Sequence, residues 1–564
     1  MRLCRLPFPQ NALAIVMIGI IGCGDSKSGI PAPFVEAPIR PAAPSADDSS
    51  ADSADEMTAA TSETYVAVPE NNLQSVRQHP LSTFSIDVDT ASYSNIRRFL
   101  QQRRLPPPDA VRIEECLNYF SYDDLPPAGE ELFAVRAEVS DCPWQPEHRL
   151  ARIGICAKRI AREHRPASNI VFLLDVSGSM QHPRKLPLLQ QSMHMLVDQL
   201  GETDHVAIVV YAGAAGVVLP STSATRKEAI HQAIQNLRAG GSTNGGLGIR
   251  LAYDIAIDNF LSDGVNRVIL CTDGDFNVGI TDQNQLTDFI RERARSGVFL
   301  SVLGFGMGNL KDATMEMLAD RGNGHYAYLD SIAEAKKVLV DQISGALVTI
   351  AKDVKIQVEF NPAQVAAHRL IGYDNRRLAN RDFKDDTRDA GEIGAGHHVT
   401  ALYEIVPATL RQAIKPPVVD PLKYQPAIGI PSPPVQPTPT VAAAGTPGTP
   451  SCSSLQDELL TIKIRYKPAR DFSSQQVELA VSDHGTALTE ATADFRFSSA
   501  VAMFGLLLKR SPYRGHASFA QVRQLAEAAM GNRPHPERIE FLELINLADS
   551  LASDRSQFRE PQGD

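Results

Sequence analysis

The sequence predicts an α/β protein in which a doubly wound, mostly parallel sheet follows a small N-terminal α/β module and precedes a C-terminal β-sheet with a helical cap. Strand-like apolar runs and amphipathic helical stripes alternate between residues 166 and 348, as in a parallel sheet that helices cover on both faces. After residue 349 the hydrophobic period changes to two, which is typical of antiparallel sheet. The chain has 564 residues, too many for one hydrophobic core, so we expect several domains.

The first 23 residues have the layout of a bacterial export signal. Two arginines precede an apolar run over residues 12–21, and Gly22-Cys23 follows it. The run is too short to span a bilayer comfortably as a helix. The residues up to Cys23 resemble the lipobox of bacterial lipoproteins, in which this cysteine is lipidated, and Gly24 after it resembles outer-membrane sorting. We therefore expect a lipid-anchored protein of the cell envelope, at the outer membrane or cell surface, with a plain signal peptide or an uncleaved anchor as alternatives.

Residues 24–72 are predicted to be a disordered tether behind that anchor. They are rich in Pro, Ala, Ser and Asp and have no periodic apolar positions. Part of the net charge of −11 lies here, and an acidic chain of this kind argues against nucleic acid as the main partner. No C-x-x-C pair occurs among the seven cysteines, so a structural zinc site is not expected.

The predicted elements follow in chain order. Residues 73–165 form the N-terminal companion, with a strand at 84–88 and a helix at 93–100 that Asp89 or Thr90 caps. The doubly wound domain, residues 166–348, is predicted to hold buried strands at 169–174, 205–211, 268–271 and 298–303, a helical stripe at 189–200, a helix through 251, a helix near 286–290 and two further helices.

The C-terminal domain, residues 349–560, is predicted to combine sheet and helix. Strands at 354–360, 399–405 and 460–466 alternate apolar and polar residues, which predicts an antiparallel sheet with one solvated face. A Pro-rich insert at 412–456 reads as a disordered loop. Residues 500–551 have helical apolar spacing and are predicted to form the helical cap.

Oxygen-bearing side chains gather where the strands and helices of the doubly wound domain begin or end. The first strand ends in Asp175-Val-Ser177-Gly-Ser179, Thr243 lies in a Gly-rich loop that opens a helix, and Asp273 follows a second buried strand. Ligands bind at the carboxyl ends of strands in an open α/β sheet. Three hydroxyls and two carboxylates are a hard, all-oxygen ligand set, which suits Mg²⁺, with Mn²⁺ or Ca²⁺ as alternatives. Simple helix capping would not require these five residues in this order.

The same five residues resemble a known metal site. Asp175-x-Ser177-x-Ser179, Thr243 and Asp273 match the metal-ion-dependent adhesion site of von Willebrand factor A domains. The resemblance implies that Ser177, Ser179 and Thr243 offer hydroxyl oxygens and that the two aspartates act directly or through water. It also implies a coordination position left open for an Asp or Glu of a partner protein, so we expect a protein-binding module and not an enzyme.

Segments outside that domain extend the resemblance to bacterial lipoproteins that carry a von Willebrand A domain between an N-terminal companion and a C-terminal domain. The resemblance covers nearly the whole mature chain except the Pro-rich insert. The segments that carry it are residues 84–93, 369–373, 389–396 and 493–497.

Two other functions stay open at this point. The chain could be an envelope assembly factor in which the metal serves stability alone. It could also be a metal-dependent phosphatase, because Asp87-Val-Asp89-Thr90 after a short strand is similar to the nucleophile motif of haloacid dehalogenase-type enzymes. The fifth position of that motif is Ala91, however, and no doubly wound domain surrounds it, so a strand end that feeds a capped helix is the simpler interpretation.

Overall fold

The structure of the chain is a computed structural model. It describes residues 63–243, 245–274, 283–342, 345, 347–388, 390–413, 457–469, 471, 473–531 and 534–557. The predicted signal peptide with Cys23, the tether up to residue 62 and nearly all of the Pro-rich insert lie outside these residues. All described residues belong to one compact unit, Ala60–Asp564. Within the described ranges, no helix has both the length and the apolar character to cross a membrane.

The central sheet has six strands in the order β10-β9-β8-β5-β6-β7, and every neighbouring pair is parallel except β6 with β7. Every residue of β5 is buried, so its continuous apolar run was a correct sign of burial on both faces. The doubly wound sheet is confirmed; the edge strands β7 and β10 were not predicted. The strands are β5 (Ser168–Asp175), β6 (His205–Tyr211), β7 (Ala215–Ser223), β8 (Val265–Thr272), β9 (Val298–Phe305) and β10 (Tyr326–Leu329).

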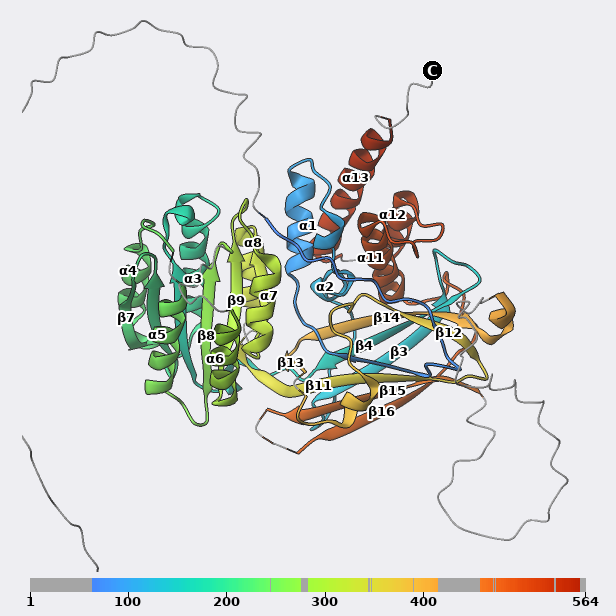
Figure 1. Ribbon diagram of the computed structural model, residues 1–564, viewed down its shortest axis with the longest axis horizontal. Helices are drawn as coiled ribbons and strands as arrows, with labels where there is room; N and C mark the ends of the chain where they lie inside the picture. Colours follow the sequence, from blue (N-terminus) through green and yellow to red (C-terminus); the bar gives the residue numbers. More distant parts are fainter. Residues whose placement is uncertain are drawn as a thin grey trace, which may run out of the picture. The chain divides into compact units, whose positions relative to one another are not determined.

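Helices cover both faces of this sheet (Figure 1). Successive residues of β5 point into different hydrophobic clusters: Phe172 shares one with Met193 of α3, and Leu173 shares another with Tyr253 of α5. The helices are α3 (Leu186–Gln199), α4 (Lys227–Gln235), α5 (Gly245–Asp258), α6 (Gln283–Arg295), α7 (Asp312–Arg321) and α8 (Ile332–Lys336).

Two antiparallel sheets are built from both ends of the chain. One sheet has the strand order β1-β12-β14-β4-β3. The other has the order β13-β11-β15-β16, and β2 pairs with its strand β11. The predicted boundaries of the N-terminal companion stay a prediction, but the companion shares both sheets with the C-terminal domain. The strands are β1 (Gln74–Ser75), β2 (Leu81–Ser85), β3 (Phe133–Asp141), β4 (Arg149–Ala157), β11 (Thr349–Phe360), β12 (Val365–Ile371), β13 (Gly391–Gly394), β14 (His398–Pro407), β15 (Glu458–Pro468) and β16 (Gln475–Ser482).

The prediction of a solvated face is wrong for β14. Leu402 packs in the cluster formed with the helices, whereas its neighbour Tyr403 packs in the cluster between the sheets. Thr400 and Glu404 of this strand are also buried, and Arg369 and His148 bind the carboxylate of Glu404, which is only 3% exposed. The alternating pattern of β14 thus reflects two buried environments, one of which tolerates a paired charge.

The predicted helical cap is confirmed and is larger than expected. Helix α11 begins at Ala493, where the Thr492 hydroxyl accepts the backbone N–H of Phe495. Two helices from the N-terminal part join it in one apolar cluster around Phe497. The helices of this layer are α1 (Ala91–Gln101), α2 (Ile113–Tyr119), α11 (Ala493–Lys509), α12 (Phe519–Ala528) and α13 (Pro536–Gln557).

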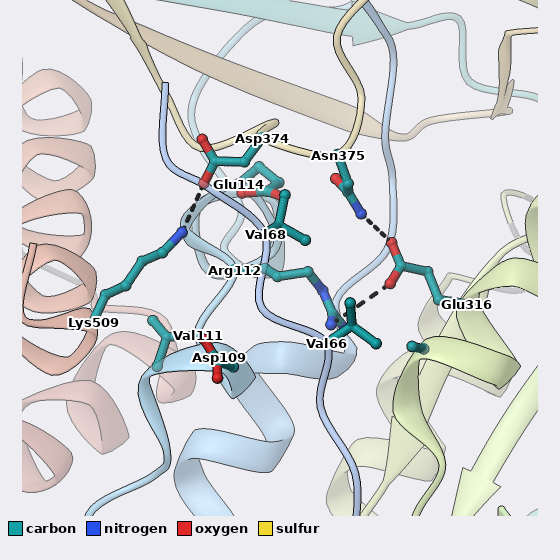
Figure 2. Close-up of a pocket in the computed structure, with 11 residues that line it drawn as sticks. Val66, Val68, Asp109, Val111, Arg112, Glu114, Glu316, Asp374, Asn375 and Lys509 are labelled. Carbon is teal, nitrogen blue, oxygen red and sulfur yellow. Dashed lines mark hydrogen bonds and ion pairs between the residues drawn. The ribbon is translucent and has the colours of Figure 1, made fainter. Parts of the chain in front are cut away.

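The predicted tether reached residue 72, and this is wrong for residues 63–72, which we call the N-terminal strap. Both carboxylate oxygens of Glu63 accept hydrogen bonds from Arg98, at 2.8 and 2.9 Å. Thr64 forms a parallel β-bridge with Lys311, and further along Val66 lines a small cavity beside Glu114 (Figure 2). Composition alone did not reveal these contacts, because each partner lies far away in the sequence.

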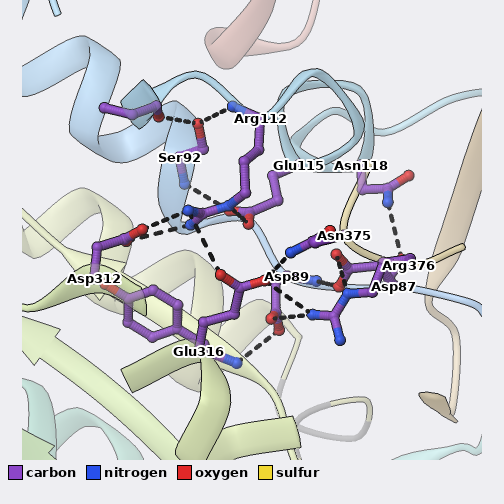
Figure 3. A network of polar contacts seen from close by, with 12 residues as sticks. Asp87, Asp89, Ser92, Arg112, Glu115, Asn118, Asp312, Glu316, Asn375 and Arg376 are labelled. Atoms are coloured by element: carbon purple, nitrogen blue, oxygen red, sulfur yellow. Dashed lines mark hydrogen bonds and ion pairs between the residues drawn. The ribbon is translucent and has the colours of Figure 1, made fainter. Parts of the chain in front are cut away.

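A mostly buried cluster of charges, the ionic junction, connects three parts of the chain (Figure 3). Arg112 beside α2 binds Glu115, Asp312 and Glu316, and Arg376 after β12 binds four carboxylates. The junction thereby fixes α7 of the central domain to segments before and after that domain. It comprises two arginines and six acids: Arg112, Arg376, Asp87, Asp89, Glu115, Asp312, Glu316 and Asp320.

Candidate metal centre

Strand β5 ends at Asp175, whose fully buried carboxylate is held by groups from three neighbouring segments. The backbone N–H of Ser177 donates to its Oδ1 at 2.8 Å. The hydroxyls of Tyr211 on β6 and Thr272 on β8 donate to its Oδ2, at 3.3 and 3.4 Å. Because the strands are parallel, their carboxyl ends meet at one edge of the sheet, and Asp175 is fixed there before any ligand binds.

The two predicted serines link this loop to Asp273. The Ser177 and Ser179 hydroxyl oxygens lie 3.1 Å apart, and the Ser179 hydroxyl donates to Asp273 Oδ2 at 2.6 Å. Asp273 immediately follows β8, and Gly274 after it has a φ of 100°, which lets the loop pass closely by Leu310. Four of the five predicted residues are therefore connected by hydrogen bonds at one edge of the sheet.

Thr243 lies in a loop that is bound to the serine loop through the backbone. Gly240 donates to the Val176 carbonyl at 2.7 Å, and Gly178 donates to the Gly241 carbonyl at 3.0 Å. Within the part of the chain that the structure describes, the Thr243 hydroxyl makes no hydrogen bond to the other four predicted residues. We refer to the five residues Asp175, Ser177, Ser179, Thr243 and Asp273 as the metal edge.

Lys185 is a further polar residue at the metal edge, and the sequence analysis missed it. Its ammonium nitrogen lies 2.8 Å from Asp273 Oδ2 and 3.1 Å from Asn309 Oδ1, and the residue is only 6% exposed. The sequence offers one signal that could have found it: a lysine directly before the apolar stripe of α3, a few residues after the serine motif. Asn309 carries no such signal, because its loop is brought there by β9.

The two carboxylates of the metal edge have opposite electrostatic surroundings. Burial raises the pKa of Asp175 to about 6, which the hydrogen bonds from Ser177 only partly offset. Burial also acts on Asp273, but the hydrogen bonds from Lys185 and Ser179 outweigh it and lower the pKa of that carboxyl below its ordinary value. Both aspartates are therefore ionised at neutral pH and available to a cation.

The donor set of the metal edge fits a hard divalent cation. All five side chains offer oxygen, and two of them are ionised, which is the chemistry that Mg²⁺ selects. No group of three or more His, Cys, Asp or Glu side chains able to hold a metal occurs among the described residues, so a softer, zinc-like site is not found there. Asp175, Ser177, Ser179, Thr243 and Asp273 are the residues that would hold the ion.

Comparison with known proteins identifies the chain. Residues 169–343 match the von Willebrand factor type A domain, residues 59–152 match a model described as von Willebrand factor, and residues 345–551 match the C-terminal model of the uncharacterized protein YfbK. YfbK of Escherichia coli is 42% identical over 494 residues, which cover 86% of this chain and 81% of YfbK. The chain belongs to the YfbK family. The predicted central domain with its two flanking parts is thus confirmed.

More distant relatives share less of the YfbK-family chain. Human inter-alpha-trypsin inhibitor heavy chain H4 is 31% identical over 160 residues, 27% of this chain and 17% of the human protein. Among solved structures, a von Willebrand factor type A protein from Catenulispora acidiphila is 14% identical, covers 74% of this chain and 91% of its own, and has a TM-score of 0.40. None of these comparisons assigns the YfbK-family chain a catalytic activity.

The residues of the phosphatase-like motif belong to the ionic junction. Arg376 lies 3.1 Å from Asp87 Oδ2 and 3.4 Å from Asp89 Oδ2, and Asp89 also accepts the backbone N–H of Tyr326 at 2.7 Å. Neither candidate cap of α1 acts as predicted: Thr90 occupies the N-cap position without a side-chain cap hydrogen bond. The motif therefore holds elements together in this structure.

Proposed function

We propose that this protein is a cell-envelope lipoprotein that binds a divalent cation, in the first place Mg²⁺, at the metal edge and uses it to recognise a protein partner. The observation that supports this most directly is the run of hydrogen bonds from Asp175 through Ser177 and Ser179 to Asp273 at the carboxyl ends of β5 and β8. It brings two carboxylates and two hydroxyls from separate loops to one point, and a third hydroxyl, that of Thr243, lies on the adjoining loop.

The composition of the site favours recognition of an acidic group. The five donors can fill at most five of the six oxygen positions that Mg²⁺ prefers, so a bound ion would keep a position for a further oxygen. A carboxylate from a partner Asp or Glu is the anionic oxygen that proteins can supply to it. Ser179 is exposed, and Leu247 in the first turn of α5 is 56% exposed close to Thr243 in the chain. An exposed apolar side chain beside a charged site suits contact with a protein surface.

Metal binding is tested by calorimetric titration of the full chain with Mg²⁺ and Mn²⁺. We expect one site per chain, and we expect Ser179→Ala to weaken binding at least tenfold because a ligand oxygen is lost. Asp288→Ala is the matched control, since it removes an acidic side chain that is 73% exposed on α6 of the same domain. Absence of heat in the unaltered chain, or equal binding by both variants, would refute the proposed metal site.

Partner recognition is tested by affinity capture from a membrane extract with Mg²⁺ or with EDTA. The proposal expects a set of proteins that the full chain retains in Mg²⁺ and loses both in EDTA and in the Ser179→Ala variant. If the same proteins stay bound in EDTA, the ion takes no part in recognition. An assembly role in which the metal serves stability alone would then account better for the result.

The lipid anchor has its own test, because Cys23 lies outside the described residues. The proposal rests on the apolar run at residues 12–21 and on the cysteine that ends it. We expect the chain to sediment with membranes and the Cys23→Ala variant to lose its covalently bound lipid. If the Cys23→Ala variant incorporates as much labelled fatty acid as the natural chain, lipidation at Cys23 is ruled out.

A further inference from the structure

Lys185 already places a positive charge where the proposed metal would act. Lys185 is the last residue before α3. Its side chain contacts Asp273 and is nearly excluded from solvent, with 8% of the side chain exposed. Its ammonium group binds the same Asp273 oxygen, Oδ2, that accepts the Ser179 hydroxyl. The one carboxylate oxygen that faces the serine hydroxyls thus has two donors, and a divalent ion or its bound water must share or replace them.

The backbone around Lys185 is adapted to this position. Gly306 has a φ of 78°, and a Cβ atom at that residue would overlap the Cγ, Cδ and Cε atoms of the lysine. Only glycine therefore lets the lysine side chain pass along this loop. Asn309 in the same loop accepts a hydrogen bond from the ammonium nitrogen at 3.1 Å, which fixes the end of the side chain. Contacts at both the stem and the head indicate a position that the fold maintains.

We propose that Lys185 is a resident cation that competes with the divalent ion for Asp273 and sets a low metal affinity at the metal edge. This inference rests on the proposed metal site and adds the residue that regulates it. Asp175, Asp273 and Lys185 together carry a net charge of about −1 at neutral pH, whereas the carboxylates alone would carry about −2. A bound divalent ion then leaves the site with a net positive charge, which a carboxylate from the partner neutralises.

The alternative role for Lys185 is to hold Asp273 in place for the metal. The two roles predict opposite results when the charge is removed. A competing ammonium group weakens metal binding, so its loss strengthens binding. A supporting ammonium group orders the ligand, so its loss weakens binding. The sign of the change in Mg²⁺ affinity therefore distinguishes the two roles of Lys185.

The test compares Mg²⁺ affinity of the full chain with that of Lys185→Met and Lys185→Gln, by calorimetry at physiological ionic strength. Methionine keeps the aliphatic stem, and glutamine also keeps a hydrogen-bond donor, so a shared effect belongs to the charge. Lys227→Met is the matched control, because its ammonium nitrogen binds only a backbone carbonyl, that of Asp198, at 2.9 Å. We expect both Lys185 variants to bind Mg²⁺ at least tenfold more tightly and the control to be unchanged.

The outcomes separate this inference from the proposed function. If the unaltered chain binds Mg²⁺ and the Lys185 variants bind equally or more weakly, competition is wrong and the metal site stands. If only the Lys185 variants bind, competition is right, and the native site is closed to the ion. If none binds, both proposals fail. Thermal unfolding gives a second measurement, which can also be made on a less stable variant because each protein is compared with and without Mg²⁺. Mg²⁺ should raise the melting temperature of the folded Lys185 variants more than that of the unaltered chain.

Discussion

At the metal edge one ammonium group binds one carboxylate, that of Asp273, whereas at the ionic junction two guanidinium groups bind six carboxylates. Arg376 alone contacts four of them: Asp87 and Asp89 precede the central domain, and Glu316 and Asp320 belong to its helix α7. At the metal edge Ser179 is exposed, and the ammonium group of Lys185 binds Asp273 at 2.8 Å. The planar guanidinium group of arginine has five N–H donors, so it can bind several acids at once and suits a fixed contact between segments. A lysine such as Lys185 holds its acid through one point charge, which an arriving cation can replace.

The largest effect on folding is expected at the ionic junction, from Arg376→Met. The change leaves Asp87 and Asp89 buried without their cation, and breaking such a network costs about 3–5 kcal/mol. Urea denaturation monitored by circular dichroism measures the loss. Arg381→Met is the control, since its side chain is 86% exposed. A loss no greater than that of the control would show that the junction does not hold the parts together.

An effect of pH on stability is expected near the ionic junction, because acids outnumber cations there. Glu114 is 2% exposed, and burial, with the nearby Asp374 and Asp87 carboxylates, raises its pKa from 4.5 to about 7. Between these values the unfolded chain has lost its proton while the folded chain keeps it, so stability falls as pH rises from 4.5 to 7 and stays lower above. The penalty reaches on the order of 3 kcal/mol.

The variant Glu114→Gln isolates this effect, because its amide stays neutral at every pH. We expect its free energy of unfolding, relative to the unaltered chain, to increase between pH 4.5 and 8. Urea titrations at the two pH values measure the change. Histidines that also titrate affect both proteins equally and cancel in the difference. A relative stability that does not change with pH would mean that Glu114 ionises freely in the folded protein.

A smaller loss is expected where the N-terminal strap meets α1. Glu63→Gln weakens the paired hydrogen bonds with Arg98, whose side chain is only 4% exposed, and we expect a cost of about 1–3 kcal/mol. Glu130→Gln is the control, because the side chain of Glu130 is fully exposed. Equal urea midpoints for both variants would indicate that the strap contributes nothing to the fold.

The smallest effect on folding is expected at the metal edge itself. Ser177→Ala with Ser179→Ala removes two hydroxyls and leaves the Lys185 contact to Asp273 intact, so we expect a loss within about 1 kcal/mol. The same urea denaturation measures it. A loss as large as that of Arg376→Met would make the metal edge a second structural joint and remove the contrast between the two regions.

Local sequence patterns predicted the parts of the fold that depend on local physics. The continuous apolar run of β5 and the helical period of α3 depend only on neighbouring residues. The sequence therefore predicted the bounds of both elements to within a few positions. The metal edge could also be predicted, because strand ends and a fixed serine spacing bring its residues together. The strap, the sharing of sheets and the ionic junction could not, since Glu63 and Arg98, or Asp89 and Arg376, meet only after distant segments have packed.

The position of Lys185 lies between these two cases. Its sequence position next to α3 is local, but its contact with Asn309 depends on the path of a loop more than a hundred residues away. The adjacent histidines His397 and His398 show the same limit, because their surroundings come from distant parts of the chain. Both residues line a cavity of about 430 Å³, and burial lowers the pKa of His397 to about 4. A side chain's neighbours across the fold decide its environment.

Electron paramagnetic resonance of Mn²⁺ measures directly whether the metal edge binds a divalent ion, because free Mn²⁺ gives a strong signal that binding removes. Titration of the full chain should show one bound ion per chain, which excess Mg²⁺ releases. The Ser177→Ala, Ser179→Ala double variant, folded as judged by its urea midpoint, should leave the signal of free Mn²⁺ undiminished. If that variant binds Mn²⁺ as the unaltered chain does, or if the unaltered chain binds none, the metal edge is not a metal site.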